Sequence, residues 1–206
     1  MTERRYDAVM FDLLTALIDS WTLWNAAAGS EADGLRWRRK YLELTYGQGA
    51  YRSYESLVTM AAEQSGMDSW FAAQLLRRWD ELPPWPETIP LLRELARRVP
   101  LGVATNCSIE LGRRAAARCQ VPFAVVVTAE EAGFYKPRPE PYQRVLAKLG
   151  TAPQRTLFVA GSAADVLGAK GVGMPVYWHN RMGLPAVGDA KPDFAERSLT
   201  PILELV

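Results

Sequence analysis

Short apolar runs alternate with amphipathic helical patterns through most of this chain, and this alternation constrains its fold more than any other feature. The runs after residue 87 cover 101–105, 123–127, 156–160 and 175–178, and the helical patterns cover 87–98, 109–118, 140–149 and 163–172. Continuous apolar runs are typical of strands that helices bury on both faces. The sequence therefore predicts an α/β fold, a Rossmann-like parallel sheet with helices on both faces.

A further apolar run, 6–12, lies far ahead of the others and ends on Asp12. Between residues 20 and 79 the pattern changes, because apolar and aromatic side chains recur there at spacings of three and four without a β-branched run. This periodicity is typical of amphipathic helices. The Pro-Pro-Trp-Pro segment at 83–86 then ends helical continuity. We therefore expect a helical block that is inserted directly after the first strand.

The length of 206 residues supports one domain with a sizeable insertion, since a domain averages roughly 150 residues. We expect a core domain made of residues 1–17 and 89–206, and a helical cap domain made of residues 18–88. Most of the seven Trp and eight Tyr residues lie before residue 90, and many of them fall in this cap. We expect most of these rings to pack against one another and the others to wall a small substrate site.

The composition excludes several functional classes. The 24 Lys and Arg residues against 23 Asp and Glu residues give a net charge of +1, which offers no field for nucleic acid or an anionic membrane. No apolar stretch approaches the roughly 18 residues of a membrane span, and the first residues lack a signal-peptide pattern. Two cysteines do not make a disulfide framework. A cytoplasmic protein is expected, and a homodimer stays open because the cap is apolar and aromatic.

Polar side chains gather where the predicted strands end. Ligands of parallel α/β sheets bind beyond the carboxyl ends of the strands. That rule selects four short stretches, which are 12–16, 105–108, 135–137 and 160–165. Together they offer two carboxylates, one ammonium group and several hydroxyl or amide groups. This combination is what covalent catalysis by a carboxylate needs.

These stretches resemble the four motifs of the haloacid dehalogenase superfamily. The matching residues are Phe11-Asp12, Thr105-Asn106, Lys136 before a proline, and the segment Gly161 to Asp165. The resemblance covers essentially the whole chain and is closest to the branch of 2-haloacid dehalogenases. Segments similar to that branch are 37–45 in the cap, Tyr135-Lys136-Pro137 with Tyr142, residues 178–181, and the tail around 192–199.

The resemblance implies a metal-independent reaction with an aspartyl-ester intermediate and without a cofactor. Asp12 would be the nucleophile, and Lys136 would keep its carboxylate ionised. Arg38 would receive the departing halide, because a fixed guanidinium stabilises an anion as it forms. Asp165, with Lys136 and Ser162, would orient the water that hydrolyses the ester. The expected substrate is a small halogenated carboxylic acid, and the products are a 2-hydroxy acid and halide.

The resemblance also implies a set of substrate-binding residues. It consists of Leu13, Leu14, Arg38, Thr105, Asn106 and Tyr142. The side chains and backbone N–H groups of Thr105 and Asn106 would hold the substrate carboxylate. The same two residues are also suited to cap the helix that follows them, and the two uses are compatible because helix N-termini bind anions.

A magnesium-dependent phosphatase is the first alternative. Phosphatases of this superfamily carry a second Asp two residues after the nucleophile, where it protonates the departing alkoxide, and this chain has Leu14 there. They also carry an Asp before the serine of the fourth motif, where this chain has Gly161. Losing two carboxylate ligands leaves a degenerate Mg²⁺ site. Both departures disfavour phosphoryl transfer.

Departures from the dehalogenase pattern support a second alternative, a catalytically lapsed binding protein. The family threonine four residues after the nucleophile is Ala16 here, and Thr15 replaces a glycine. The family sequence Ser-Ser-Asn in the fourth motif is Ala160-Gly161-Ser162 here. Since that asparagine helps to position the hydrolytic water, Ser162 would have to substitute for it. Two family aromatic residues are also replaced, one by Leu14 and one by Ala164.

Two remaining reactive side chains have no expected role in catalysis. His179 is the only histidine and follows Trp178 at a strand end, so we expect an ordinary surface or packing residue. Cys107 lies beside the second motif without a candidate base, and we expect a small buried filler. No Ser-His-Asp triad can be assembled from this sequence with comparable support.

Overall fold

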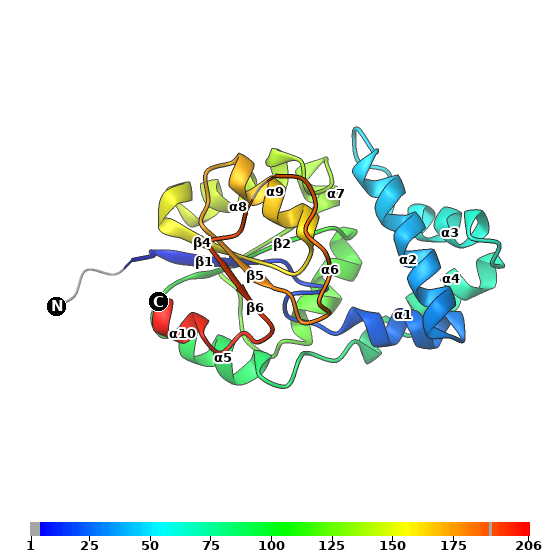
Figure 1. Cartoon of the computed structure of the whole chain (residues 1–206), viewed down its shortest axis with the longest axis horizontal. Coiled ribbons are helices and arrows are strands. Elements are labelled where there is room, and N and C mark those ends of the chain that lie inside the picture. Colours follow the sequence, from blue (N-terminus) through cyan, green and yellow to red (C-terminus); the bar gives the residue numbers. More distant parts are fainter. Residues whose placement is uncertain (1–4, 190) are drawn as a thin grey trace.

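The computed structural model of the chain describes residues 5–189 and 191–206, and within them six strands form one parallel sheet (Figure 1). The strand order is β3-β2-β1-β4-β5-β6. The strands are β1 (Ala8–Phe11), β2 (Leu101–Thr105), β3 (Val125–Thr128), β4 (Thr156–Ala160), β5 (Val176–His179) and β6 (Phe194–Glu196). The predicted α/β class with a parallel sheet is therefore confirmed.

Six helices cover the two faces of the sheet. They are α5 (Thr88–Leu95), α6 (Ile109–Ala117), α7 (Ala129–Ala132), α8 (Pro139–Leu149), α9 (Ala163–Gly171) and α10 (Ile202–Leu205). Successive side chains of a strand point to opposite faces, so β1 contributes to both layers of the core. Val9 and Phe11 belong to the apolar cluster that includes α5, α6 and α10, whereas Met10 belongs to the cluster that includes α8 and α9.

Four helices lie between β1 and β2 in the chain, as the sequence predicted for the segment after the first strand. They are α1 (Ser20–Ala28), α2 (Glu31–Tyr46), α3 (Tyr54–Gln64) and α4 (Ser69–Arg77), and a 3₁₀ turn, η1 (Trp79–Glu81), follows them. Each begins after a side chain that accepts a hydrogen bond from the first turn, namely Asp19, Ser30, Ser53 or Asp68. Figure 1 shows them grouped beyond the end of the sheet at which β1 ends.

Aromatic side chains form the centre of this helical group. The Trp24 ring lies 4.7 Å from the ring of Trp37 and 5.5 Å from that of Tyr41, centroid to centroid. Tyr54 lies 5.4 Å from Tyr41 and 5.6 Å from Trp79. All five rings are buried, and their tilted and edge-on contacts stabilise the group beyond simple burial of apolar area. These aromatic residues therefore pack, as the sequence predicted for most of them.

The chain enters and leaves the helical group through two paired segments. Ile18 and Pro84 form an antiparallel bridge, and the Asp19 N–H donates to the Pro83 carbonyl at 2.8 Å. Further along the chain, the Tyr41 hydroxyl donates to the carbonyl of Asn106 at 3.2 Å. The helices are therefore fastened to the sheet at their base and at the carboxyl end of β2.

The strand order places a binding crevice at the middle of the sheet. β1 is central, and it pairs with β2 on one side and with β4 on the other. Connections run outward from β1 in both directions, and ligands of such sheets bind where the direction reverses, beyond the carboxyl ends of the strands.

None of the helices in the described residues is long and apolar enough to cross a membrane.

The structure also contains elements that the sequence did not predict. β6 is a short, largely exposed edge strand, so it lacks the apolar run on which the other predictions depended. The η2 turn (Pro153–Arg155) precedes β4, and α7 is a single turn after β3. β3 begins at residue 125 and not at 123. None of these differences changes the position of the crevice.

Candidate active site

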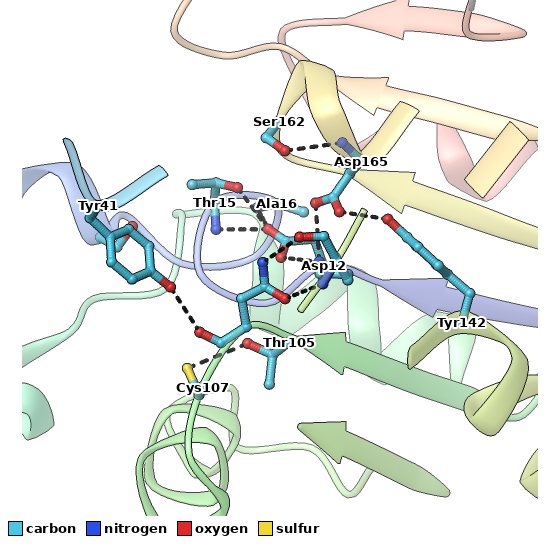
Figure 2. A network of polar contacts seen from close by, with 12 residues as sticks. Asp12, Thr15, Ala16, Tyr41, Thr105, Cys107, Tyr142, Ser162 and Asp165 are labelled. Atoms are coloured by element: carbon cyan, nitrogen blue, oxygen red, sulfur yellow. Dashed lines mark hydrogen bonds and ion pairs between the residues drawn. The ribbon is translucent and has the colours of Figure 1, made fainter. Parts of the chain in front are cut away.

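Three ionisable side chains from different parts of the chain meet at the crevice (Figure 2). Asp12 directly follows β1, Lys136 lies in the loop before α8, and Asp165 lies in the first turn of α9. The Lys136 Nζ lies 2.7 Å from Asp12 Oδ1 and 3.0 Å from Asp165 Oδ2. All three residues are at least 94% buried by surface area, with 6%, 2% and 5% of their surface exposed. The structure therefore brings together three residues that the sequence singled out.

The pKa values of the two carboxylates shift in opposite directions. Burial alone raises the pKa of Asp12, but the charge of Lys136 and hydrogen bonds from Lys136 and Thr15 outweigh it, so this pKa lies below its ordinary value. For Asp165 burial prevails over Lys136, and its pKa lies above the ordinary value. Burial lowers the pKa of Lys136, yet the two carboxylates outweigh it and the pKa is raised. Asp12 is thus the carboxylate of the pair that keeps its charge to lower pH.

Neighbouring side chains fix the positions of Lys136 and Asp165. The Asn106 amide donates to the Lys136 carbonyl at 3.1 Å, and its oxygen accepts from the Lys136 N–H at 2.8 Å. The Tyr142 hydroxyl donates to Asp165 Oδ1 at 2.8 Å. The Ser162 hydroxyl accepts from the Asp165 N–H at 3.2 Å and caps α9. The three charged groups are therefore held by a polar shell that leaves them little rotational freedom.

Arg38 is a buried cation on α2 with no carboxylate beside it. Only 8% of its surface is exposed, and its Nη2 donates to the Ser20 hydroxyl at 3.0 Å. Its guanidinium carbon lies 3.9 Å from the centroid of the Trp21 ring. Among the residues that the structure describes, Nη1 has no hydrogen-bond partner, and no carboxylate oxygen lies within 4.0 Å of the guanidinium. Such a group is costly to bury unless an anion binds to it.

A cavity of about 80 Å³ lies between these charged groups. Asp12, Lys136 and Asp165 line it from the sheet, and Arg38 lines it from α2. The other lining residues are Leu14, Thr15, Trp21, Tyr41, Leu42, Tyr46, Asn106, Gly161, Ser162 and Leu184. One water needs about 10–15 Å³ of such space, so the cavity has room for a small molecule of several non-hydrogen atoms. The site is therefore suited to a small anion with an apolar part.

Three residues of the predicted substrate-binding set do not line this cavity. Leu13 is fully buried in the apolar core. Thr105 is also buried, and its hydroxyl donates to Cys107 Sγ at 3.5 Å. Tyr142 supports Asp165 from behind. Asn106 does line the cavity, but both polar atoms of its side chain are engaged by the Lys136 backbone. Leu13, Thr105 and Tyr142 thus lie behind the residues that line the cavity.

Sequence reasoning missed the contact between Thr15 and Asp12. The Thr15 hydroxyl donates to Asp12 Oδ2 at 2.7 Å, and the N–H groups of Thr15 and Ala16 donate to the same oxygen at 3.1 and 3.2 Å (Figure 2). The available signal is a hydroxyl three residues after the candidate nucleophile, but spacing alone does not show that this hydroxyl reaches the carboxylate. Leu184, in the loop after β5, carried no signal at all.

The two other reactive side chains are buried in supporting positions. His179 has 1% of its surface exposed, and its Nδ1 lies 2.8 Å from the Ala16 carbonyl oxygen. Since a carbonyl only accepts, this nitrogen carries the proton. Cys107 is fully buried, which raises the pKa of its thiol to about 12 and keeps it from acting as a nucleophile. His179 thus packs inside the molecule and not on the surface.

The donor set does not fit a magnesium ion. Mg²⁺ requires an octahedron of hard oxygen ligands, and the Lys136 ammonium occupies the place between the two carboxylates. An ideal Cβ at Gly161 would lie 2.1 Å from the Thr15 hydroxyl oxygen, so this backbone leaves no room for a carboxylate side chain there. The described residues contain no group of three or more His, Cys, Asp or Glu side chains that could hold a metal.

Comparisons with known proteins identify the family of the chain and proteins of the same fold. The family model of haloacid dehalogenase-like hydrolases matches residues 6–173. Haloacetate dehalogenase H-2 of Moraxella sp. (strain B) is 28% identical, with 98% of this chain and 99% of that protein covered. The pyrophosphatase PpaX of Bacillus velezensis is 26% identical, with 100% and 98% covered. The structure of L-2-haloacid dehalogenase from Xanthobacter autotrophicus with chloropropionic acid covalently bound has a TM-score of 0.83 at 23% identity, with 97% and 98% covered.

The chain has a parallel α/β sheet with buried carboxylates at its switch point and helices between its first two strands, and the family model that matches it is one of hydrolases. The family match covers most of the chain and includes every one of these charged residues. The chain belongs to the family of haloacid dehalogenase-like hydrolases.

Proposed function

We propose that this protein is a metal-independent 2-haloacid dehalogenase that acts on a small halogenated carboxylic acid. The single observation that supports this most is the pair of buried charges facing one cavity, an ionised Asp12 and an Arg38 without a carboxylate partner among the described residues. When a carboxylate displaces a halide, the negative charge moves from the carboxylate to the halide. The reaction therefore needs an ionised carboxylate to attack and a cation to receive the halide. The relatives named as haloacetate and haloacid dehalogenases support the same class of substrate.

In the first step, a lone pair of the Asp12 carboxylate attacks carbon 2 of the substrate from the side opposite the halogen. The carbon–halogen bond breaks, and the halide leaves with the bonding electrons. Arg38 also lines the cavity, and its guanidinium stabilises this anion as it forms. A halide is stable without a proton, which agrees with the absence of a carboxyl group at Leu14. The product of this step is an aspartyl ester, inverted at carbon 2.

In the second step, water attacks the Cγ atom of the ester and transfers a proton to Asp165. The raised pKa of Asp165 suits a general base better than the lowered pKa of Asp12 would. The tetrahedral intermediate then releases the 2-hydroxy acid, which takes the proton back from Asp165. The water oxygen remains in the Asp12 carboxyl group, whose remaining proton passes to solvent.

We propose further that residues 18–88 form a cap that closes the site. Arg38, Trp21 and Tyr46 reach the cavity from this segment, and they face Asp12 from the sheet. A closed cap that excludes water would strengthen the attraction between Arg38 and a departing anion, because the dielectric constant falls when water leaves. The cavity volume of about 80 Å³ favours two- and three-carbon acids over larger substrates.

Halide release from chloroacetate and from 2-chloropropionate tests the proposal. We expect release from at least one of these acids, unchanged by a metal chelator, with the corresponding 2-hydroxy acid in equal amount. A second assay measures hydrolysis of p-nitrophenyl phosphate in the presence of Mg²⁺, because one relative of the chain is a pyrophosphatase. Phosphatase activity without halide release, from well-folded protein, would overturn the proposal.

The two carboxylates should separate the two chemical steps as the pH falls. Asp165 has the raised pKa and becomes protonated first, whereas Asp12 has the lowered pKa and stays ionised. Ester hydrolysis is therefore expected to slow before alkylation does, so alkylated enzyme accumulates in the pH range around 3.8, the ordinary value for both groups. Rapid quenching and intact-protein mass spectrometry measure the alkylated fraction.

The control is a return to neutral pH, at which the trapped ester should hydrolyse. Near-UV circular dichroism at each pH reports whether the enzyme remains folded. Equal slowing of both steps, with no alkylated enzyme in the folded range, contradicts the assignment of Asp165 as the base of the second step.

A further inference from the structure

The two oxygens of the Asp12 carboxylate have very different surroundings. Oδ2 accepts three hydrogen bonds, from the Thr15 hydroxyl and from the N–H groups of Thr15 and Ala16. Oδ1 accepts one, from Lys136, among the residues that the structure describes. Three donors saturate the lone pairs of Oδ2, whereas Oδ1 keeps a free direction. Only Oδ1 is therefore positioned to attack a carbon atom, and Oδ2 becomes the carbonyl oxygen of the ester.

We propose that the Thr15 hydroxyl is a catalytic hydrogen-bond donor in an oxyanion hole that serves the hydrolysis of the aspartyl ester. This inference rests on the proposed function. When water adds to Cγ, the π electrons of the Cγ–Oδ2 bond move onto Oδ2, which becomes an oxyanion. When the intermediate collapses, these electrons return to form the carbonyl, and the bond between Cγ and Oδ1 breaks. The three donors on Oδ2 are already in place for that charge.

A neighbouring aromatic residue holds one of the backbone donors in position. The Trp85 indole N–H donates to the Thr15 carbonyl at 3.1 Å. This carbonyl and the Ala16 N–H belong to the same planar peptide unit and point in opposite directions. Fixing the carbonyl therefore also fixes the N–H that donates to Asp12 Oδ2. The hole is thus preorganised and does not need to form during the reaction.

The absence of a side chain at Gly161 leaves the space that Thr15 and the Ala16 nitrogen occupy. An ideal Cβ at position 161 would lie 2.1 Å from the Thr15 Oγ1, 2.3 Å from the Ala16 nitrogen and 2.5 Å from the Thr15 carbonyl carbon. Contacts this short do not occur, so a side chain at 161 would displace the hydroxyl and the segment that carries it. Because two of these contacts are with backbone atoms, they would occur whatever residue stands at position 15, so this backbone requires glycine at 161.

Separate measurement of the two chemical steps tests this role. In Thr15→Val, which keeps the shape but removes the hydroxyl, we expect ester hydrolysis to slow by about 10²- to 10³-fold. Alkylation should continue, so halide appears in a burst of one equivalent per enzyme and the alkylated protein dominates the mass spectrum. Thr15→Ser keeps the hydroxyl and should hydrolyse the ester within about tenfold of the unmodified enzyme.

Thr59→Val is the matched control, because the Thr59 hydroxyl on α3 donates only to the Glu55 carbonyl of its own helix among the described residues. It should change neither step. If Thr15→Val does not fold, Thr15→Ala is used in the same test, because alanine is smaller than threonine and cannot overpack the site. Ester hydrolysis at an unchanged rate in either variant, or equal slowing of both steps, overturns the role of Thr15. Absence of halide release from the unmodified enzyme overturns the proposed function instead.

Discussion

Replacing Asp12 with asparagine is expected to lower halide release by about 10⁴-fold or more, as removal of a catalytic nucleophile does in other enzymes. The amide has nearly the shape of the carboxylate but is a poor nucleophile. Lys136 keeps the Asp165 carboxylate as a partner, so the loss of one ion pair should not unfold the site. Halide release and intact-protein mass together measure the effect, and no alkylated Asp12→Asn protein should be found.

Asp80→Asn is the matched control for this change. Asp80 lies on the surface, where it pairs with Arg114 and takes no part in the cavity. Its substitution should leave halide release unchanged. Dehalogenation by the folded Asp12→Asn variant within about tenfold of the unmodified rate would show that another group attacks the substrate.

Arg38→Met is expected to separate activity from stability. Halide release should fall by about 10²- to 10³-fold, because the departing anion loses its charged donor. The melting temperature should stay the same or rise, since methionine does not carry the cost of burying a cation whose Nη1 has no partner among the described residues. Halide release and thermal unfolding of the same preparation measure the two effects.

Arg39→Met provides the comparison on the same helix, because Arg39 is exposed. It should change neither halide release nor melting temperature appreciably. A marked loss of stability in Arg38→Met, with activity reduced only in proportion to the unfolded fraction, would indicate that Arg38 is a structural residue.

Much of the fold could be predicted because its central strands are apolar throughout. Runs of this kind leave few alternatives to a parallel sheet, and β2 and β4 begin and end at the predicted residues. The edge strand β6 could not be predicted in this way, since two of its three residues are exposed. Its pairing with β5 depends on tertiary contacts that a local pattern does not encode.

The ionic centre of the site could be predicted because strand ends converge in a parallel sheet. Asp12 follows β1 and the loop to Asp165 follows β4, and these two strands are neighbours. The hydrogen bonds around this centre could not be predicted, because they depend on the direction of individual side chains. Thr105 is the last residue of β2, yet its hydroxyl contacts Cys107 and not the cavity. The hydrogen bond from Thr15 to Asp12 depends on the space that Gly161 leaves, which no spacing in the sequence reveals.

The central claim, that Asp12 forms a covalent ester, is tested most directly by a single turnover in water enriched in oxygen-18. With enzyme in excess over chloroacetate, each active site reacts at most once. We predict unlabelled 2-hydroxy acid and one oxygen-18 atom in the peptide that contains Asp12, because the product takes its oxygen from the carboxylate and water replaces it. Labelled product together with an unlabelled Asp12 peptide would contradict the account, since water would then have attacked the substrate directly.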